Sequence, residues 1–423
     1  MNDITYNRES SFPLDQDEKD GLKGFRAEYH IPVKNGKETI YFCGNSLGLQ
    51  PKNASDYLSG EMNRWKTMGV EGHFTDENPW VYYHKNGRAE MARLVGAKPS
   101  EVIAMNNLTT NLHLMLASFY QPTSLRRKVI IEAGAFPSDH FAVTSHMQQK
   151  GIDVEENLIE VEMDESGYLS NELICKTIED VGTELALVLL PGIQYYSGQF
   201  LNISAITAAS HKVGALVGFD LAHAAGNLPM SLHDDKVDFA VWCSYKYLNS
   251  GPGNLSGVFI HETHSQNTNF PRLAGWWGQD EKTRFKMENV FTPMKGADGW
   301  MLSNMNILTT AIHIGALKLF DRAGIENLRA KSVRLTGYLE YLLLNSVALQ
   351  DKLKIITPSN LEERGCQLSL SFHENGRQVF DHLIANNVVL DWREPNVIRV
   401  APTPMYNTFQ EVYRFVKLLE EAI

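Results

Sequence analysis

The chain has 423 residues, a length that allows one large domain with one or two smaller ones. Hydrophobic residues make up 43% and charged residues 21% of the chain, as in ordinary globular proteins, which excludes a disordered protein, a collagen and a coiled coil. The 50 acidic against 39 basic residues give a formal charge of -11, which repels polyanions. We therefore expect no nucleic-acid partner.

The cysteines and the N-terminus bear on the cellular compartment. Cys43, Cys175, Cys243 and Cys366 lie far apart without a Cys-x-x-Cys pair, so neither a zinc knuckle nor a disulfide framework is predicted. The first twenty residues lack an apolar signal-peptide core, and no apolar run is long enough to cross a bilayer. We expect a cytoplasmic protein without membrane contact.

The middle of the chain alternates between strand and helix patterns. Short apolar or β-branched runs bounded by turn residues predict buried strands at 128–131, 185–190, 215–219, 238–243 and 257–260. Helix-compatible stretches such as 137–149 and 205–213 lie between several of them. This βαβ rhythm is typical of a parallel sheet covered on both faces, and it predicts a large α/β domain.

The C-terminal part has a different pattern. Ile307, Ala311, Ile314 and Leu317 form one helical stripe that stops near Gly324, and a second helix runs through residue 343. Strand-like runs follow at 353–356, 367–372, 388–391 and 398–401. Thr408 and Glu411 then form a capping box before a closing amphipathic helix. The chain therefore ends in a small α/β domain, and the helix pair connects it to the large one.

A lysine follows the predicted strand 238–243. In Ser244-Tyr245-Lys246, an apolar strand ends in a hydroxyl, a phenol and an amine. Ligand sites in open parallel sheets lie at the carboxyl ends of strands, and a desolvated lysine there can form a Schiff base with an aldehyde cofactor. The alternative is a solvated lysine after a strand.

An aspartate ends the preceding strand. Asp220 follows residues 215–219 and is followed by Leu221-Ala222-His223. Pyridoxal phosphate needs both a lysine that holds it and a carboxylate that keeps its ring nitrogen protonated. Lys246 and Asp220 together predict this cofactor, although Asp is also a common turn residue after a strand.

The cofactor's phosphate needs hydrogen-bond donors. Asn106-Asn107-Leu108-Thr109-Thr110-Asn111 begins an apolar helix, whose amino end attracts anions, and Thr109 and Thr110 add hydroxyls. These residues can equally serve as helix caps, and the two roles are compatible.

Two further motifs carry no such prediction. The stretch from Gly251 to Gly257 does not fit the dinucleotide fingerprint and precedes a strand, so it is interpreted as a turn. His261 and His264 fall in a polar loop with no obvious third ligand. We predict no metal.

Several segments together resemble the kynureninase family of fold-type-I pyridoxal-phosphate enzymes. They are Ser244 to Asn249, Gly218 to His223, Phe42 to Leu49, Phe136 to Asp139, Gly275 to Gly278, Arg284 to Met287 and Ile398 to Pro402. They stand in the family's order, and the match runs from about Tyr41 to the C-terminus. The Asp and the Lys are shared with class-V aminotransferases and cysteine desulfurases, but the whole set is not.

The resemblance implies a mainly parallel, seven-stranded-type sheet in a large domain and a small α/β domain. It implies an N-terminal segment over 1–75 that packs with the small domain, a cofactor-binding domain over 76–320 and the small domain over 321–423. The implied reaction is hydrolysis of L-kynurenine or 3-hydroxy-L-kynurenine to anthranilate or 3-hydroxyanthranilate plus L-alanine. Lys246, Tyr245 and Asp220 would be catalytic, with Tyr245 carrying a proton and contacting the phosphate.

The same resemblance assigns the other site residues. Phe136 would stack on the pyridine ring, and Leu108, Thr109, Ser138, Asp139 and His223 would line the cofactor. Ser46 lies in a family segment and is assigned to substrate binding, and Arg399 would clamp the substrate carboxylate. Trp276 and Asn304 are family positions that reach the neighbouring subunit's cofactor, which implies a homodimer with shared active sites. Interface packing is the alternative role for Trp276.

Substrate choice is partly visible in the sequence. His73 and the Ser303-Asn304 pair resemble the family forms that prefer 3-hydroxykynurenine, because polar groups there could bond the extra hydroxyl. Pro191 stands where relatives can carry a small hydroxyl residue, which affects one cofactor contact.

Two other functions stay open at this point. One is a different class-V enzyme, an aminotransferase or a cysteine desulfurase; a desulfurase needs a mobile reactive cysteine, whereas Cys366 sits in a strand-like run typical of buried packing. The other is a non-catalytic dimeric scaffold, which the presence of Lys246, Asp220, Tyr245 and Arg399 disfavours.

Overall fold

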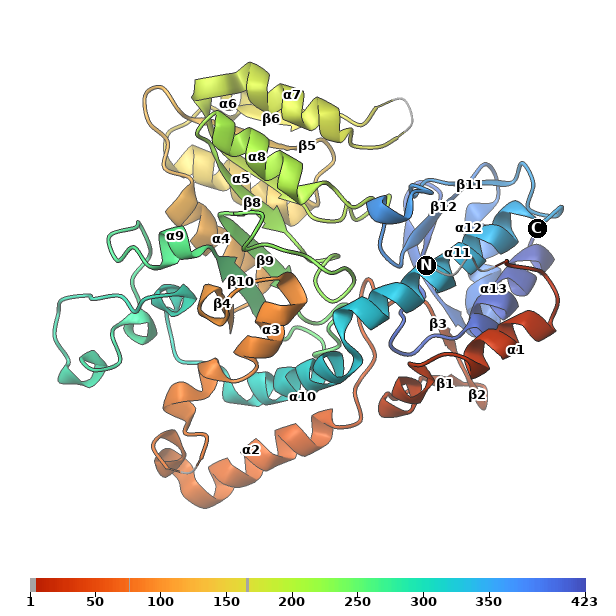
Figure 1. The fold of residues 1–423 in the computed structure, drawn as a ribbon, viewed down its shortest axis with the longest axis horizontal. Coiled ribbons are helices and arrows are strands. Elements are labelled where there is room, and N and C mark those ends of the chain that lie inside the picture. Colours follow the sequence, from red (N-terminus) through yellow and green to blue (C-terminus); the bar gives the residue numbers. More distant parts are fainter. Residues whose placement is uncertain (1–4, 76, 165–166) are drawn as a thin grey trace.

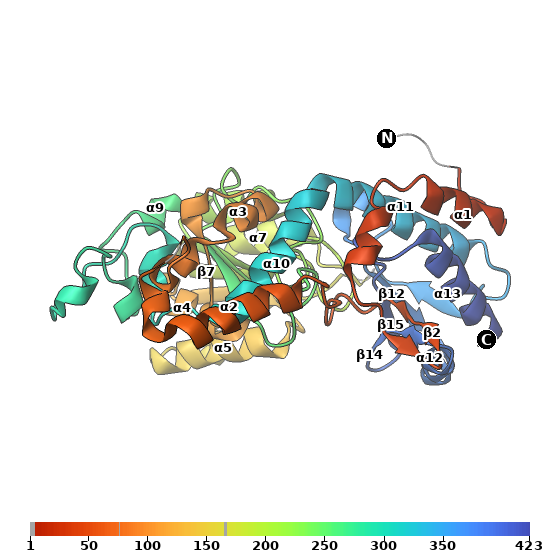
Figure 2. The ribbon, with the colours of Figure 1, turned by 90° about the horizontal axis from the view of Figure 1, so that it is seen from below.

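The computed structural model describes residues 5–75, 77–164 and 167–423, and it has two lobes (Figure 1). The helices α10 (Ile307–Ala323) and α11 (Ile325–Leu344) run between the lobes and meet at Gly324. The C-terminus and the first described helix lie at the smaller lobe, where α1 (Ser11–Glu18) packs beside α13 (Phe409–Glu421) (Figure 2). The helix pair predicted as a connector is confirmed.

A seven-stranded mixed sheet forms the core of the large lobe. Its strands, in spatial order, are β4 (Val102–Met105), β10 (Ser256–Ile260), β9 (Phe239–Cys243), β8 (Leu216–Asp220), β7 (Leu185–Pro191), β5 (Lys128–Glu132) and β6 (Leu158–Val161). β10 runs antiparallel to both of its neighbours, and the other neighbours are parallel. The central strands are buried from end to end, as continuous apolar runs predict.

Helices cover both faces of this sheet. α4 (Leu108–Phe119) and α5 (Pro137–Gln149) pack together on one face, and α7 (Asn171–Val181) and α8 (Ile203–Lys212) pack together on the other (Figures 1 and 2). The predicted α/β class is therefore confirmed. The short helices α6 (Val154–Asn157) and α9 (Glu262–Ser265) lie in connections, and α3 (Arg88–Val95) packs beside β4.

Two strands of the large sheet carry little signal in the sequence. β4 is only four residues long, and β6 is an edge strand in which Glu160 is exposed. Neither presents a long apolar run or a clean alternation, so neither was predicted. The five strands that were predicted are all present, within one or two residues of their expected bounds.

The small lobe contains a four-stranded antiparallel sheet. In spatial order its strands are β11 (Leu353–Ile355), β12 (Leu368–Phe372), β15 (Val397–Val400) and β14 (Asp391–Arg393), and α11, α12 (Gly376–Ala385) and α13 complete the lobe. The capping box of α13 is confirmed: Glu411 N donates to Thr408 Oγ1 at 3.1 Å, and Thr408 N donates to Glu411 Oε2 at 3.1 Å.

The prediction of one strand over residues 388–391 is wrong. β13 (Val388–Val389) pairs in parallel with β3 (Ile40–Tyr41) near the N-terminus, and β14 begins at Asp391 in a different sheet. The first half of this run pairs with β3 and the second half with β15, so one run in the sequence becomes two short strands.

The N-terminal residues are held by the small lobe. Asp17 accepts hydrogen bonds from Phe409 N at 2.7 Å and Gln410 N at 3.1 Å, at the start of α13. Lys331 and Asp20 form a buried ion pair at 2.7 Å. The hairpin of β1 (Val33–Lys34) and β2 (Lys37–Glu38) follows, and α2 (Ala54–Met68) packs along α10.

Among the residues that the structure describes, no helix combines the length and the apolar character that crossing a bilayer requires.

Candidate active site

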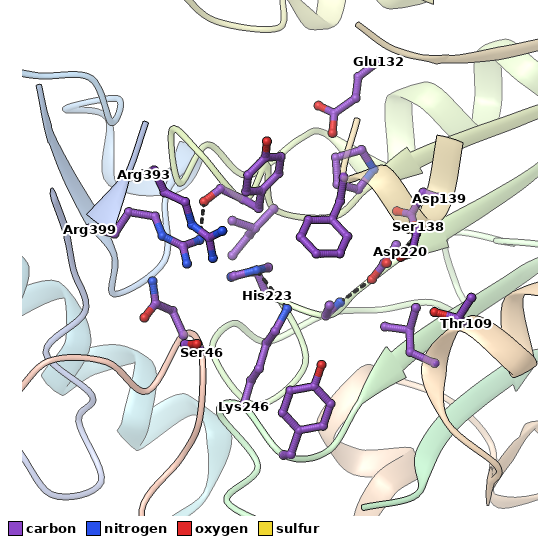
Figure 3. Close-up of a pocket in the computed structure, with 18 residues that line it drawn as sticks. Ser46, Thr109, Glu132, Ser138, Asp139, Asp220, His223, Lys246, Arg393 and Arg399 are labelled. Carbon is purple, nitrogen blue, oxygen red and sulfur yellow. Dashed lines mark hydrogen bonds between the residues drawn. The ribbon is translucent and has the colours of Figure 1, made fainter. Parts of the chain in front are cut away.

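A cavity of about 350 Å³ lies where the central strands of the large sheet end and the small lobe begins (Figure 3). Both lobes contribute to its wall, as expected for an open α/β sheet. The structure brings together here most of the residues predicted from the sequence, namely Ser46, Leu108, Thr109, Phe136, Ser138, Asp139, Pro191, Asp220, His223, Tyr245, Lys246 and Arg399.

Lys246 reaches into the cavity from the loop that follows β9. Its Nζ lies 3.0 Å from Nε2 of His223. Burial and the positive charge of Lys246 hold the pKa of His223 well below its ordinary value of 6.5, so the imidazole is neutral and its Nε2 can accept a hydrogen bond from Lys246 Nζ. The lysine is therefore oriented by a neutral base.

A pair of carboxyl groups stands across the cavity from the arginines. Asp220 ends β8, and its Oδ1 accepts a hydrogen bond from Ala222 N at 2.7 Å. Asp139, in the first turn of α5, shares a hydrogen bond with Asp220. Burial and the neighbouring Asp220 charge raise the pKa of Asp139 well above its ordinary value. Burial raises the pKa of Asp220 as well, but the Lys246 charge and the hydrogen bond from Ala222 oppose this, so Asp139 is the protonated member and Asp220 keeps the carboxylate.

Glu132 is a third carboxyl group in the cavity, and the sequence analysis missed it. It ends β5, is 2% exposed, and its Oε2 has no hydrogen-bond partner in the described part of the chain. Burial raises the pKa of Glu132 to about 8, against a hydrogen bond from the Gln194 side chain. The signal was present, since Glu132 follows an apolar strand as Asp220 does.

The N-terminus of α4 forms another part of the wall. Asn107 is its N-cap, with Oδ1 accepting from Thr110 N at 3.2 Å and from Thr110 Oγ1 at 2.8 Å. Leu108 and Thr109, in the first turn, line the cavity with free backbone donors for an anion. The capping role is confirmed for Asn107. The expectation that Thr110 supplies a hydroxyl is wrong, because that hydroxyl is used by Asn107 and Thr110 lines a different cavity.

Aromatic residues close the cavity. Phe136 is 42% exposed, and its ring meets the Tyr195 ring edge-on at 5.5 Å. Tyr245 also lines the wall, and burial next to Cys243 raises the pKa of its phenol, which is therefore protonated at neutral pH. Asn45, Ile193, Tyr195 and Ala222 complete the wall and were not identified from the sequence.

The small lobe contributes two arginines, Arg393 and Arg399, on the left of Figure 3. Arg399 is 1% exposed and donates to the Tyr195 carbonyl at 2.7 Å and to Asp391. Arg393 was missed in the sequence, although it follows Asp391 at the two-residue spacing that places both side chains on one face of β14.

The cavity is therefore polarised. Carboxyl groups gather at the end of the large sheet, whereas Lys246, Arg393 and Arg399 face the other side. This arrangement fits pyridoxal phosphate, since Asp220 can hold a protonated ring nitrogen, Phe136 offers a face for stacking and the start of α4 offers donors for phosphate. Glu132 Oε2 and His223 Nδ1 are buried atoms still without a partner, which is typical of a site that receives a polar group.

Four predicted site residues lie outside this cavity. Ser303 and Asn304 are exposed and line a separate cavity of about 400 Å³ together with Asn107 and Thr110. His73 and Trp276 lie on the outer surface of the large lobe, where Trp276 is 50% exposed. The single chain does not bring these four residues to Lys246.

The segment around Gly48 supports the lysine loop. Gly48 N donates to the Tyr245 carbonyl at 2.8 Å. A Cβ at this position would stand 2.3 Å from the Lys246 carbonyl oxygen, so no larger residue fits without moving the loop. The need for glycine here explains one residue of the segment from Phe42 to Leu49.

The histidines that the sequence placed in a polar loop have structural partners. His261 lies with His233 beside Glu101, so potential third ligands do exist, contrary to expectation. However, Glu101 already accepts from Lys98 N at 2.9 Å, Glu262 N at 2.8 Å and His233 Nδ1 at 3.0 Å. His264 Nε2 lies 2.6 Å from Asp238. These contacts account for the cluster without a metal.

Cys366 is fully buried, as its strand-like run predicts. Burial raises the pKa of its thiol to about 12, so it is not the mobile thiolate that a desulfurase needs.

Comparisons with known proteins agree with this site. Residues 328–419 match the family model of the kynureninase C-terminal domain. The chain is 49% identical to a kynureninase of Flavobacterium psychrophilum, covering 97% of each chain. It is 51% identical to a kynureninase of Stenotrophomonas maltophilia, covering 96% of each.

Solved structures show the same fold at lower identity. The cysteine desulfurase of Thermococcus onnurineus superposes with a TM-score of 0.75 at 17% identity, over 100% of this chain and 99% of that chain. The cystine C-S lyase C-DES gives a TM-score of 0.75 at 17% identity, over 90% of this chain and 97% of that chain. The near full-length identity to the two relatives, together with the Lys246 and Asp220 cavity, places the chain in the kynureninase family.

Proposed function

We propose that the protein is a pyridoxal-phosphate-dependent kynureninase of tryptophan catabolism, which also leads to NAD biosynthesis. It hydrolyses the Cβ–Cγ bond of L-kynurenine or 3-hydroxy-L-kynurenine and releases the aryl acid and L-alanine. The observation that carries this proposal is the joint placement of Lys246, Asp220 and Arg399 around one cavity. Family membership at about half identity supports the choice among enzymes of this fold.

The chain's own residues have distinct tasks in this reaction. Bound pyridoxal phosphate supplies an electron sink for negative charge formed at the substrate Cα. Asp220 holds the ring nitrogen protonated, with Asp139 donating to its carboxylate. Lys246 holds the cofactor and moves the Cα proton at Nζ, and neutral His223 orients that atom. Tyr245 keeps its phenolic proton and can deliver it to a developing carbanion or leaving group.

We propose a preference for the 3-hydroxy substrate. His73 Nδ1 lies 3.1 Å from the Val70 carbonyl oxygen, so Nδ1 carries the proton and Nε2 is an acceptor. An acceptor of this kind can bond the extra phenolic hydroxyl, and Ser303 and Asn304 can supply further polar contacts. A site built for a hydroxyl discriminates strongly against the substrate that lacks it.

We also propose a homodimer with shared active sites. His73, Phe74, Phe285 and Trp276 form a chain of ring contacts on one exposed surface, with centroids about 6 Å apart. Ser303 and Asn304 lie in the cavity next to the first turn of α4, which also faces the Lys246 cavity. A twofold axis near this turn would bring each chain's Asn304 and Trp276 to the partner's cofactor.

Two remaining proposals concern organisation and compartment. We propose a division into an N-terminal segment over 1–75, a cofactor domain over 76–320 and a small domain over 321–423, supported by the bonds between Asp17 and α13. We propose a cytoplasmic location, because all four cysteines are free thiols.

The test is steady-state kcat/KM for both substrates on the cofactor-loaded protein, with alanine identified as the second product. Cleavage of either substrate is expected. A large ratio in favour of 3-hydroxykynurenine that falls in His73→Phe supports the assigned role of His73. A ratio near one contradicts the proposed preference, and turnover of neither substrate contradicts the function.

A further inference from the structure

The Arg399 guanidinium is partly engaged by contacts within the protein. Its Nη1 donates to the Tyr195 carbonyl at 2.7 Å, and its Nη2 donates to the Asp391 carboxylate. Its Nε is buried without a partner in the described part of the chain. Two of the five guanidinium N–H donors are therefore engaged within the protein, and the remaining ones belong to a side chain that is buried in the wall.

Arg393 also lines the cavity, and not all of its guanidinium N–H donors are engaged. Its Nη2 donates to Asp391 at 3.2 Å and its Nε lies 3.1 Å from the same carboxylate. Within the described residues, Nη1 contacts no acceptor, and the guanidinium lies 5.9 Å from the Tyr195 ring centroid. Unlike Arg399, the Arg393 side chain is 35% exposed, and it faces the cavity.

The sheet register explains this arrangement. Asp391 in β14 is directly opposite Arg399 in β15. Arg393 is two residues beyond Asp391, so all three side chains project from the same face of the small sheet. One carboxylate therefore fixes two guanidinium groups at the wall of the cavity.

The small-lobe wall of the cavity carries more positive than negative charge. Two arginines share the single carboxylate of Asp391, and Lys246 adds a third positive charge nearby. The acidic groups that line the cavity, Glu132, Asp139 and Asp220, belong to the large lobe and are not paired with either arginine. The wall therefore carries a surplus of positive charge that suits an anionic group.

We propose that Arg393 is a second arginine of the site for the substrate α-carboxylate, acting with Arg399, and that Asp391 is the positioning residue that orients both. This inference rests on the proposed function. Arg399 supplies a buried, fixed cation, and Arg393 adds unengaged donors from the open side of the cavity.

The test compares ligands with and without a carboxylate on the holoenzyme. Arg393→Gln is expected to raise KM for L-kynurenine at least tenfold, while its binding of kynuramine, the amine that lacks the carboxylate, stays within about twofold of wild type. L-Alanine, followed through the absorbance of the bound cofactor, is expected to bind at least tenfold more weakly. Arg377→Gln, which removes an exposed small-lobe arginine outside the cavity, is the control and should change none of these values.

Two further variants separate charge from geometry. Arg393→Lys is expected to recover only part of the loss, because an ammonium restores the charge but lacks the planar guanidinium that Asp391 orients. Asp391→Asn is expected to raise KM for kynurenine with little change in kcat and none in kynuramine binding. Unchanged kynurenine and alanine binding in Arg393→Gln overturns the proposal, as does an equal loss for kynuramine. Wild-type protein that binds alanine but cleaves no kynurenine refutes the proposed function, and the alanine titration still decides the role of Arg393.

Discussion

His223 and Lys246 show how one residue sets the state of another in this cavity. The imidazole of His223 lies 3.0 Å from the Nζ of Lys246, and its lowered pKa keeps it neutral. It can therefore orient Nζ by a hydrogen bond without adding a second positive charge. The carboxyl pair follows the same logic, because Asp139 keeps a proton so that Asp220 can keep a charge. In both pairs one member shifts the pKa of the other: Lys246 helps to lower the pKa of His223, and Asp220 helps to raise the pKa of Asp139.

Lys246→Ala tests the central residue. Turnover should fall at least about 10³-fold, because no other amine in the cavity can hold the cofactor and move the proton. Circular dichroism should be unchanged. Lys212→Ala, which removes an exposed lysine paired with Glu179, is the control and should keep full activity. Undiminished alanine release by Lys246→Ala would refute the assignment.

The two aspartates are expected to respond differently to the same change. Asp139→Asn keeps a hydrogen-bond donor toward Asp220, so activity should stay within about tenfold of wild type. Asp220→Asn removes the charge that holds the ring nitrogen protonated, so kcat should fall by about 10³-fold or more. Equal losses in kcat for the two variants would show that the proton is not held by Asp139.

At the scale of elements, Asp238 joins three parts of the large lobe. Its carboxylate contacts His211 of α8 at 3.0 Å, Val217 N of β8 at 2.8 Å and His264 of α9 at 2.6 Å. Burial alone would raise its pKa, but the hydrogen bonds from His211 and His264 outweigh burial and place it below the ordinary 3.8. The hydrogen bond to Asp238 raises the pKa of His211 above 6.5.

Asp238→Asn is expected to lower stability by about 2–3 kcal/mol, since it weakens hydrogen bonds to a buried charge. The contribution of Asp238 is complete above pH 4 and is lost only as the pH falls through its lowered pKa. The contribution of His211 is complete below pH 6.5 and is lost as the pH rises through its raised pKa. The difference in Tm between wild type and variant should therefore be larger at pH 6 than at pH 9. Asp234→Asn, in the exposed turn nearby, is the control, and an equal difference at both pH values would contradict the linkage.

The sequence predicted the elements that carry their own signal. The strands ending at Asp220 and Cys243 are continuous apolar runs, and Thr408 and Glu411 form the capping box that starts the last helix. These two strands and this helix could therefore be predicted. β14 could not be separated from β13, because their division depends on pairing with residues 40–41 from the far end of the chain. Arg393 was missed for a similar reason, since its importance comes from the register of β14 against β15.

At the scale of the whole molecule, one chain holds an incomplete set of the predicted site residues. Lys246, Asp220 and Arg399 meet in one cavity, whereas Trp276 and Asn304 are exposed and His73 is half-buried against Trp80, outside that cavity. Exposed aromatic side chains such as Phe285 and Phe74, at 52% and 60% exposure, are typical of an interface. These features support the proposed dimer.

Subunit mixing tests the shared site. Lys246→Ala protein is expected to be inactive, and a Trp276→Ala/Asn304→Ala variant to be strongly impaired. A hybrid dimer of the two contains one intact site, so mixing equal amounts under exchange conditions should restore about a quarter of wild-type activity. Mixed activity that only equals the average of the two separate variants would contradict the sharing of residues.

The attachment of the N-terminal residues to the small lobe has a consequence for how the chain is made. The first strand and helix leave the ribosome early, but β13 and α13, on which Ile40 and Asp17 depend, are synthesised last. At about 5–20 residues per second, this segment waits some twenty seconds or more for its partners. Until then Phe12, Ile40 and Phe42, all buried in the folded protein, lack their partners in β13 and α13. The apolar side chains of this N-terminal segment are therefore buried only after the C-terminal elements have been synthesised.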